Sequence, residues 1–301
     1  MLNLTLKQLK IFDAVARHLN FSRAAETLYL SQPAVSMQIK QLEDSVGMPL
    51  LEKHGKRLFL TEAGREVLHY SRTVLQQLQE MESVLGDMKG LERGQLSIAV
   101  VSTANYFMPQ LLAKFIQAHP AIGVSLSVAN RDAVIRQLIE NTADLAIMGQ
   151  PPDEADMVAH PFMDNPLVVI AAPDHPLAKQ KKITPTQLAK ETFVLRERGS
   201  GTRGVVERFF AGHHLPLPAH LEMDTNEAVK QSVNAHIGIG IISRHGIELE
   251  LETKRLCILN VTGFPIGRHW HIVHRKNKRL SVAARTFQDF LLEEAGKAKG
   301  M

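Results

Sequence analysis

Cysteine is nearly absent from this sequence, and no long apolar run occurs in it. The 301 residues contain one cysteine, Cys257, so no intrachain disulfide can form, as is usual in a reducing compartment. The most apolar stretches, Leu167–Ala172 and Ile237–Ile242, are far shorter than the roughly 20 residues that a membrane-spanning helix requires. Residues 2–18 lack the continuous apolar segment of a signal peptide. We therefore expect a soluble, cytoplasmic protein without a membrane partner.

Patterns typical of metal sites and active sites are also missing. His269, His271 and His274 lie close together in the chain, but no HExxH pair, no CxxC pair and no carboxylate at ligand spacing accompanies them. No serine, histidine and aspartate occur in the context of a nucleophile, and no pair of catalytic carboxylates is recognisable. The sequence predicts no catalytic residues, no metal site and no cofactor.

The charge distribution indicates three parts. A chain of 301 residues with 45% hydrophobic and 22% charged residues is typical of a globular protein of two or three domains. Residues 1–61 carry eight Lys or Arg against five Asp or Glu, residues 62–93 carry four against six, and residues 94–301 carry 23 against 20. The high density of positive charge in the first part favours a nucleic-acid partner, although random scatter could produce so small an excess.

The first 61 residues have the spacing of a small DNA-binding domain. Three apolar repeats at helical spacing each follow a candidate N-cap, namely Thr5, Ser22 and Ser31. Gly47 ends the third repeat, and two short extended segments (49–51 and 57–60) then flank Gly55 as a hairpin. Three helices followed by a hairpin are the parts of a winged helix-turn-helix, which is mostly α-helical.

Burial of Val35, Ile39 and Leu42 would turn a polar face of the third helix outward. A glutamine on that face can read adenine, a serine can bond to a base or phosphate, and proline or methionine can touch a thymine methyl group. The basic hairpin suits the minor groove or the DNA backbone, although such a cluster alone could be a solvated turn. The candidate DNA-binding residues are Ser22, Arg23, Ser31, Gln32, Pro33, Ala34, Ser36, Met37, Lys40, Lys53, His54, Lys56 and Arg57.

A long helix is predicted from Glu62 to Lys89, about 42 Å at 1.5 Å per residue. Its apolar residues follow a heptad spacing, which is typical of helices that pair. The stripe would be buried either in a dimer or against other helices of the same chain, and we favour the dimer. The candidate interface residues are Val67, Val74, Leu78, Met81 and Leu85.

From residue 94 onward, strand patterns alternate with helix patterns. Expected strands are 95–101, 124–128, 144–148, 167–172, 193–195, 221–223, 240–242 and 270–274; expected helices lie near 106–118, 133–141, 203–212, 227–236 and 282–294. This alternation predicts a doubly wound α/β fold with parallel sheets, in which ligands bind beyond the carboxyl ends of strands. The candidate ligand-binding residues at such positions are Ser102, Thr103, Asn105, Asn130, Arg131, Ser200, Gly201, Thr202, Arg203 and Asn226.

The segment Gly199–Gly204 spells GxGxxG between a strand and a helix, and Asp224 follows 20 residues later. This is the pattern of a dinucleotide-binding loop, so an NAD(P)-dependent oxidoreductase is the alternative hypothesis. The preceding strand is short, and the motif lies far from the start of the α/β region. The loop can also be a tight turn, or a helix start that attracts another anion.

Motifs spread over nearly the whole chain resemble those of LysR-type transcriptional regulators. They are Leu9–Phe12, Phe21–Ala25, Ser31–Ser36, Gln41–Glu43, Pro109–Leu112, Asp144–Ile147, Pro173–Leu177 and Gly199–Arg203. Met37 and Lys53 stand where members of that family often have arginine. The residues Ala34–Leu42 are also similar to regulators of RuBisCO (Calvin-cycle) operons.

The resemblance implies a metabolite-responsive transcription factor that binds promoter DNA, forms dimers or tetramers and contacts RNA polymerase. It implies a winged helix-turn-helix (1–61), a linker helix for dimerisation (62–93) and a periplasmic-binding-protein-like effector domain (94–301). Subdomain I of the effector domain would comprise 94–162 and 267–301, and subdomain II would comprise 163–266. The subgroup implies control of carbon-fixation genes by an anionic metabolite, such as a sugar phosphate, an organic acid or NADPH.

Overall fold

The structure is a computed structural model that describes residues 4–55, 57–88, 94–152, 156–217, 219–276 and 278–299. The chain forms two compact units. The first contains the N-terminal elements up to the long helix α4 (Glu62–Met88) together with residues 140–142, and the second contains the remaining elements from strand β3 (Gly94–Val101) onward. None of the helices within these ranges is long and apolar enough to cross a lipid bilayer. The predicted α/β class, with an N-terminal winged helix-turn-helix, is confirmed.

The first unit has three short helices, a hairpin and α4. The short elements are α1 (Leu6–His18), α2 (Phe21–Thr27), α3 (Gln32–Val46), β1 (Leu51–His54) and β2 (Arg57–Leu60). Thr5 and Ser31 are N-caps as predicted. The prediction for Ser22 is wrong: Asn20 caps α2, because its extended backbone lets Oδ1 accept a hydrogen bond from the N–H of Arg23.

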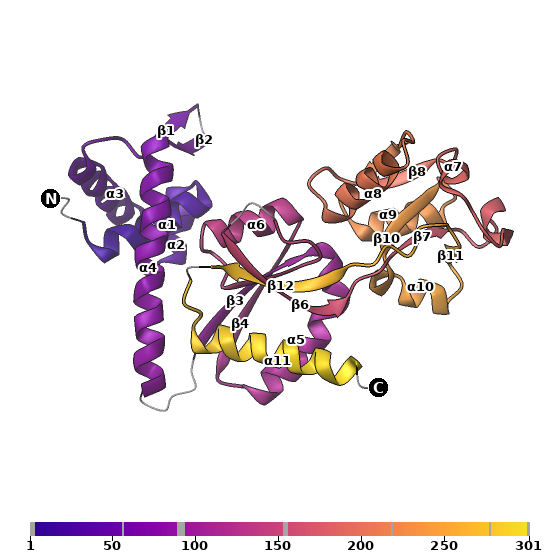
Figure 1. Ribbon diagram of the computed structural model, residues 1–301. Helices are drawn as coiled ribbons and strands as arrows, with labels where there is room; N and C mark the ends of the chain where they lie inside the picture. Colours follow the sequence, from indigo (N-terminus) through magenta and orange to yellow (C-terminus); the bar gives the residue numbers. More distant parts are fainter. Residues whose placement is uncertain are drawn as a thin grey trace. The chain divides into compact units, whose positions relative to one another are not determined.

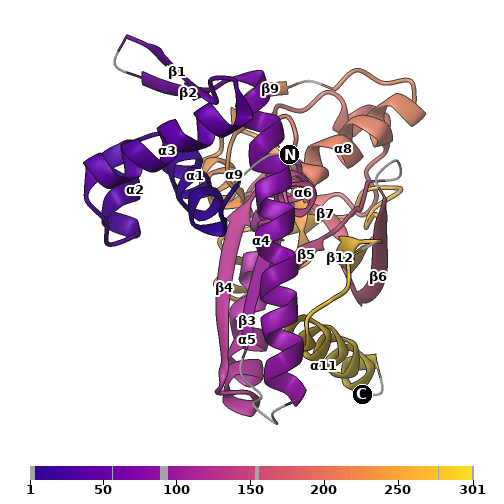
Figure 2. The same cartoon turned by 90° about the vertical axis from the view of Figure 1, so that its left-hand side faces the viewer.

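The core of the first unit joins all of these elements. Phe12, Val35 and Leu42 are fully buried in it, together with Leu50 from the segment before the hairpin. A Cβ at Gly64 would collide with the carbonyl oxygen of Leu50, so glycine allows α4 to approach this segment. In Figures 1 and 2, the first half of α4 packs beside α1, and the second half continues well beyond the three short helices.

The second unit contains two five-stranded sheets. The first sheet has the order β4-β3-β5-β12-β6, and its other strands are β4 (Ile122–Ala129), β5 (Leu145–Met148), β6 (Met157–Asp164) and β12 (His269–Arg275). Helix α6 (Arg131–Ile139) covers one face, and α5 (Met108–Ala118) and α11 (Val282–Lys299) cover the other (Figure 1). Consecutive residues of β3 are buried because both faces of the sheet are covered: Ile98 belongs to the core with α5 and α11, and Ala99 belongs to the core with α6.

The second sheet has the order β11-β7-β10-β8-β9. Its strands are β7 (Leu167–Ala171), β8 (Phe193–Arg196), β9 (Ala219–Met223), β10 (Ile239–Ser243) and β11 (Cys257–Leu259). Helix α8 (Gly201–Gly212) packs on one face, and α9 (Asn226–Asn234) packs on the other. The short elements around this sheet are η2 (Pro176–Lys179), α7 (Pro185–Leu188), η3 (Arg244–Gly246) and α10 (Glu248–Glu252).

The prediction of parallel sheets holds for only part of each sheet. In the first sheet β12 runs antiparallel to β5 and β6, and in the second β7 runs antiparallel to β10 and β11. The parallel part of each sheet is where helical crossovers join the strands. The antiparallel strands β12 and β7 follow the two segments in which the chain passes between the sheets, and no helix was predicted in these segments.

The chain crosses between the sheets twice. The first crossing runs from the end of β6 to Leu167, and the second runs through Ile266 to Arg268. The two segments are joined by hydrogen bonds between Leu167 and Ile266 in both directions, each 3.0 Å long, and by one from Asn165 N–H to Arg268 O, 2.7 Å long. The predicted boundary between residues 162 and 163 therefore lies inside β6, just before the crossing.

Candidate functional site

Helix α3 carries most of the candidate DNA-binding residues. Burial of Val35, Ile39 and Leu42 turns the opposite face to solvent, where Met37 is 55% exposed. Gln32 Nε2 donates a hydrogen bond to Ser36 Oγ over 2.8 Å, so these two side chains are held together at the start of the helix. The exposed candidates on α2 and α3 are Ser22, Arg23, Ser31, Gln32, Pro33, Met37 and Lys40, while Ala34 and Ser36 are half-buried.

A carboxylate of α3 binds the backbone at the start of the hairpin. Glu43 Oε1 accepts hydrogen bonds from the N–H groups of Leu50 (2.8 Å) and Leu51 (3.2 Å). This contact positions the basic hairpin tip relative to the exposed face of α3. Lys53, His54 and Arg57 are exposed there, and Lys56 lies outside the described residues.

Tyr29 was missed by the sequence reasoning. It lies in the turn between α2 and α3, is 96% exposed and has a positive φ of 53°. An exposed aromatic side chain held in a left-handed backbone is uncommon, and this turn is adjacent to the start of α3. The signal available in the sequence was an aromatic residue inside the helix-turn-helix turn.

The apolar stripe of α4 is largely open to solvent. Val74, Met81 and Leu85 are 43%, 52% and 48% exposed, while Val67 and Leu78 are half-buried. A stripe of large apolar side chains at this exposure is typical of a surface that pairs with another chain. The dimer interface stays a prediction.

A small cavity lies between the two subdomains of the second unit. Its walls come from the carboxyl ends of β3 and β5, from the segment that starts α6, from the end of β8 and from the start of α8. Its volume is about 20 Å³, which is the space of roughly one water molecule. Seven candidates line it: Ser102, Thr103, Asn130, Arg131, Ser200, Gly201 and Thr202.

The start of α8 brings an electropositive helix end to this cavity. Ser200 is the N-cap but makes no side-chain cap bond, and the first N–H groups of a helix have no acceptor within it. Thr202 is 6% exposed, and none of the described residues forms a hydrogen bond with its hydroxyl. The helix end therefore suits an anion. Asn130 is also a structural cap, since its Oδ1 accepts from the N–H of Ala133 at the start of α6.

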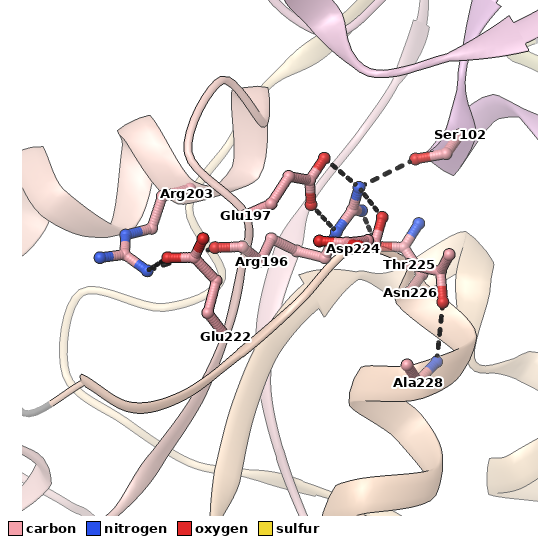
Figure 3. A network of polar contacts seen from close by, with 9 residues as sticks. All are labelled: Ser102, Arg196, Glu197, Arg203, Glu222, Asp224, Thr225, Asn226 and Ala228. Atoms are coloured by element: carbon pink, nitrogen blue, oxygen red, sulfur yellow. Dashed lines mark hydrogen bonds and ion pairs between the residues drawn. The ribbon is translucent and has the colours of Figure 1, made fainter.

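Arg203 does not line the inner cavity. Its Nε donates to Glu207 over 2.7 Å. Its Nη1 donates to the carbonyl of Arg196 and lies 3.6 Å from Glu222 (Figure 3). The guanidinium is thus paired with one carboxylate from α8 and one from β9. Asn105 is exposed in η1 (Ser102–Tyr106) and also does not line the cavity.

Arg196 joins the two subdomains at the cavity wall. This side chain is 4% exposed, and both Glu197 carboxylate oxygens accept from it, at 2.7 and 2.9 Å. It also donates to Asn226 Oδ1, to the carbonyl of Asp224 and to Ser102 Oγ (Figure 3). Asn226 therefore holds Arg196 by accepting its hydrogen bond and does not line the cavity. The sequence reasoning missed Arg196, although it lies at the carboxyl end of a strand.

Arg268 is a third residue that was not predicted from the sequence. It lies in the second crossing, and no hydrogen bond or ion pair joins its guanidinium to any of the described residues. A Cβ at Gly149 would lie 2.5 Å from Arg268 Nη2, so glycine makes room for it. Burial, followed by the charges of Arg208 and Arg131, lowers the pKa of Arg268 to about 10. It remains charged at neutral pH, and no carboxylate in the described part of the chain forms an ion pair with it.

The geometry does not favour a metal site or a dinucleotide-binding loop. Across the described ranges, no three His, Cys, Asp or Glu side chains gather in a way that could hold a metal ion. At Gly199, a Cβ would lie 2.6 Å from a carboxylate oxygen of Asp132. A dinucleotide pyrophosphate on this loop would meet that negative charge.

Comparison with known proteins identifies both units. Residues 6–65 match the family model of a bacterial regulatory helix-turn-helix protein, lysR family, and residues 89–296 match the LysR substrate binding domain. The chain is 54% identical to a RuBisCO operon transcriptional regulator of Allochromatium vinosum over 98% of both chains. It is 43% identical to the HTH-type transcriptional activator CmpR of Synechocystis, over 97% of this chain and 96% of that one.

Solved structures of related regulators are similar to this chain. The regulatory domain of Synechocystis CcmR in complex with 2-PG is 43% identical, with a TM-score of 0.65, and covers 67% of this chain and 98% of its own. A full-length OxyR from Pseudomonas aeruginosa is 21% identical, with a TM-score of 0.77, over 97% of this chain and 95% of its own, and shares the fold.

Proposed function

This chain belongs to the LysR family of bacterial transcriptional regulators, and we propose that it controls carbon-fixation genes in response to a small anionic metabolite. Residues 1–61 would bind a promoter operator, residues 62–93 would pair two chains, and residues 94–301 would bind the effector. The names of the relatives, which are RuBisCO operon regulators and an activator, support this assignment. They give no support to an NAD(P)-dependent oxidoreductase or to another enzyme.

The observation that carries the proposal is the group of positive side chains around the inner cavity. Among the described residues, Arg268 has no hydrogen-bond or ion-pair partner for its guanidinium, and Arg131 donates to the carbonyl of Gln150 and lies 3.7 Å from Asp132. The start of α8 and the Thr202 hydroxyl face the same space. Guanidinium groups, helix N-termini and hydroxyl groups together bind phosphate or carboxylate.

We infer that the effector is a phosphorylated small acid or sugar, with 2-PG as the first one to test. The related CcmR regulatory domain was solved with 2-PG, which is 2-phosphoglycolate. A cavity of about 20 Å³ is too small for it, so the two subdomains must separate before the effector enters. The effector then contacts both subdomains and favours an arrangement that differs from the empty one.

This rearrangement would carry the signal to promoter DNA. In a dimer each subunit presents one α3 helix, so the operator should be roughly palindromic. A change in the distance between these helices would alter how they fit the two half-sites and how the regulator contacts RNA polymerase.

The experiment is isothermal calorimetry of the full chain with 2-PG, followed by operator binding with and without it. Thr202→Val should keep operator binding but lower 2-PG affinity about tenfold, because a hydrogen bond to a charged group is lost. Thr262→Val is the matched control, since Thr262 is exposed and lies outside the inner cavity. Unchanged 2-PG affinity in Thr202→Val would show that the effector binds elsewhere.

A further inference from the structure

Gln150 lies where three cavities of the second unit meet. It lines the inner cavity and also two outer cavities of about 600 and 520 Å³. Each cavity is lined by two of the same three arginines. Arg131 and Arg268 line the inner one, Arg131 and Arg208 the first outer one, and Arg208 and Arg268 the second outer one.

Two of the guanidinium groups lie close enough to the third, that of Arg268, to act on its charge. The charges of Arg208 and Arg131 both act on the buried Arg268 and add to the effect of burial on its pKa. Gln150 lies between the guanidinium groups of Arg131 and Arg208. Its backbone carbonyl accepts a hydrogen bond from Arg131 Nε over 3.0 Å, and its side-chain Oε1 accepts one from Arg208 Nη2 over 2.6 Å. A neutral amide spaces the arginines without cancelling their charge.

The two outer cavities differ in their negative charge. Asp132 and Glu207 line the larger one, and each of them already lies near an arginine. Among the residues that the structure describes, no carboxylate lines the 520 Å³ cavity, and the arginines that line it are Arg208 and Arg268. His271 also lines it, and its Nδ1 is buried without a hydrogen-bond partner among the described residues. Val205, Phe209 and Ile266 form the apolar part of its wall, and Gly149, Gln150 and His269 complete the lining.

We propose that this 520 Å³ cavity is a second oxyanion site, which binds a phosphate or carboxylate group between Arg208 and Arg268. One anion there would bridge two guanidinium groups that now repel each other. Arg268 lines both the inner cavity and this one, so an anion in either changes the charge felt in the other. The link between the two cavities rests on the proposed function, because it assumes that an anionic effector binds in the inner cavity. The second site itself is inferred from the residues that line the 520 Å³ cavity.

The oxyanion can come from two sources. It can be a separate small anion that binds in addition to the effector in the inner cavity. It can also be the second anionic group of one effector, which extends past Arg268 into the outer cavity. The two sources share the same ligand chemistry, and a titration in two stages distinguishes them.

The test is calorimetry of the full chain with inorganic phosphate, first alone and then with 2-PG at saturation. Phosphate should bind the wild type, and Arg208→Gln should weaken it about tenfold or more, as expected for the loss of a charge-assisted bond. Arg255→Gln is the matched control, since Arg255 is exposed and lines none of the three cavities. It should bind phosphate like the wild type.

Phosphate binding that persists at saturating 2-PG identifies a separate anion. Phosphate binding that disappears, together with weaker 2-PG binding in Arg208→Gln, identifies the second group of one effector. Equal phosphate affinity in the wild type and Arg208→Gln would overturn the proposal. If 2-PG does not bind at all, the effector assignment fails, while the phosphate titration still decides the second site.

Discussion

Arg196 Nη2 donates a hydrogen bond to Ser102 Oγ over 3.1 Å, and this bond joins the two subdomains across the inner cavity. The oxygen of Ser102 is thereby engaged as an acceptor, which leaves its hydroxyl hydrogen free to donate into the cavity. Glu197 and Asn226 hold the guanidinium in place (Figure 3). Arg196 is therefore a positioning residue that sets the direction of the Ser102 hydroxyl.

The first prediction is that Ser102 and Arg196 act on the effector as one unit. Ser102→Ala and Arg196→Gln should each lower 2-PG affinity about tenfold, because both remove the directed hydroxyl donor. The double variant should be no weaker than the weaker single variant. Calorimetry gives the affinities, and thermal unfolding checks that each variant is folded. Additive losses would mean that the two residues act separately.

The second prediction concerns DNA recognition by α3. Gln32→Ala or Ser36→Ala should weaken specific operator binding by about 1–3 kcal/mol, because the paired side chains lie at the exposed start of the helix. Gln41→Ala is the control, since Gln41 is exposed two turns further along the same helix. Fluorescence anisotropy with operator and random DNA measures the difference. Equal losses on both DNAs would assign Gln32 and Ser36 to phosphate contacts.

The third prediction concerns assembly through α4. Leu78→Asp should release monomers and abolish operator binding, because it places a charge within the apolar stripe that contains Val74 and Met81. Sedimentation velocity measures the oligomeric state. His69→Asp carries the same new charge on an exposed position of the opposite helix face and should leave the assembly intact. An oligomeric Leu78→Asp protein with normal DNA binding would make the stripe an intrachain contact.

The fourth prediction concerns the buried Lys230. Its ammonium group lies 2.8 Å from Glu227 and 2.7 Å from Glu250, and it sits 4.9 Å above the centre of the Tyr106 ring. Lys230→Met leaves these carboxylates without a counter-charge, so the free energy of unfolding at pH 7 should fall by roughly 3 kcal/mol. Lys190→Met is the control, since Lys190 is exposed and none of the described residues forms an ion pair with it.

The effect of Lys230→Met should depend on pH. Hydrogen bonds from Lys230 and Gln231 lower the pKa of Glu227 from its usual 4.5 in the folded protein. Such a group stabilises the fold above its unfolded pKa, and the stabilisation is lost as the pH falls through the folded value. The difference in the free energy of unfolding between the wild type and Lys230→Met should therefore be smaller below pH 4.5 than at pH 7. Urea unfolding at both pH values tests this, and a constant gap would contradict it.

The elements that carry a strong local pattern could be predicted from the sequence. Ser31 and Gly47 mark the ends of α3 because capping and left-handed turns depend on nearby residues. The strand at 167–171 is a short run of apolar residues, which is recognisable wherever both faces of a strand are buried. By contrast, β6 was not predicted, because it includes a proline and pairs only with the distant β12.

Some of the candidate ligand-binding residues could be predicted from the sequence, and others could not. Ser102 and Thr202 follow from two general rules, namely that ligands bind at strand carboxyl ends and that anions bind at helix starts. Arg268 could not be found by either rule, since it follows Gly267 in a crossing that belongs to neither a helix nor a strand. Arg203 was selected for its place in the helix start, but a side-chain direction is set by partners such as Glu207, which a motif does not reveal.

The small volume of the inner cavity determines how fast an effector can arrive. A space of about 20 Å³ admits roughly one water molecule, so collisions with the closed protein are unproductive. Binding must wait for the subdomains to separate, and such collective motions take microseconds to milliseconds. In stopped-flow mixing, the observed association rate should therefore rise with 2-PG concentration and then level off at the rate of opening. A variant without the bond between Arg196 and Ser102 should level off at a higher rate.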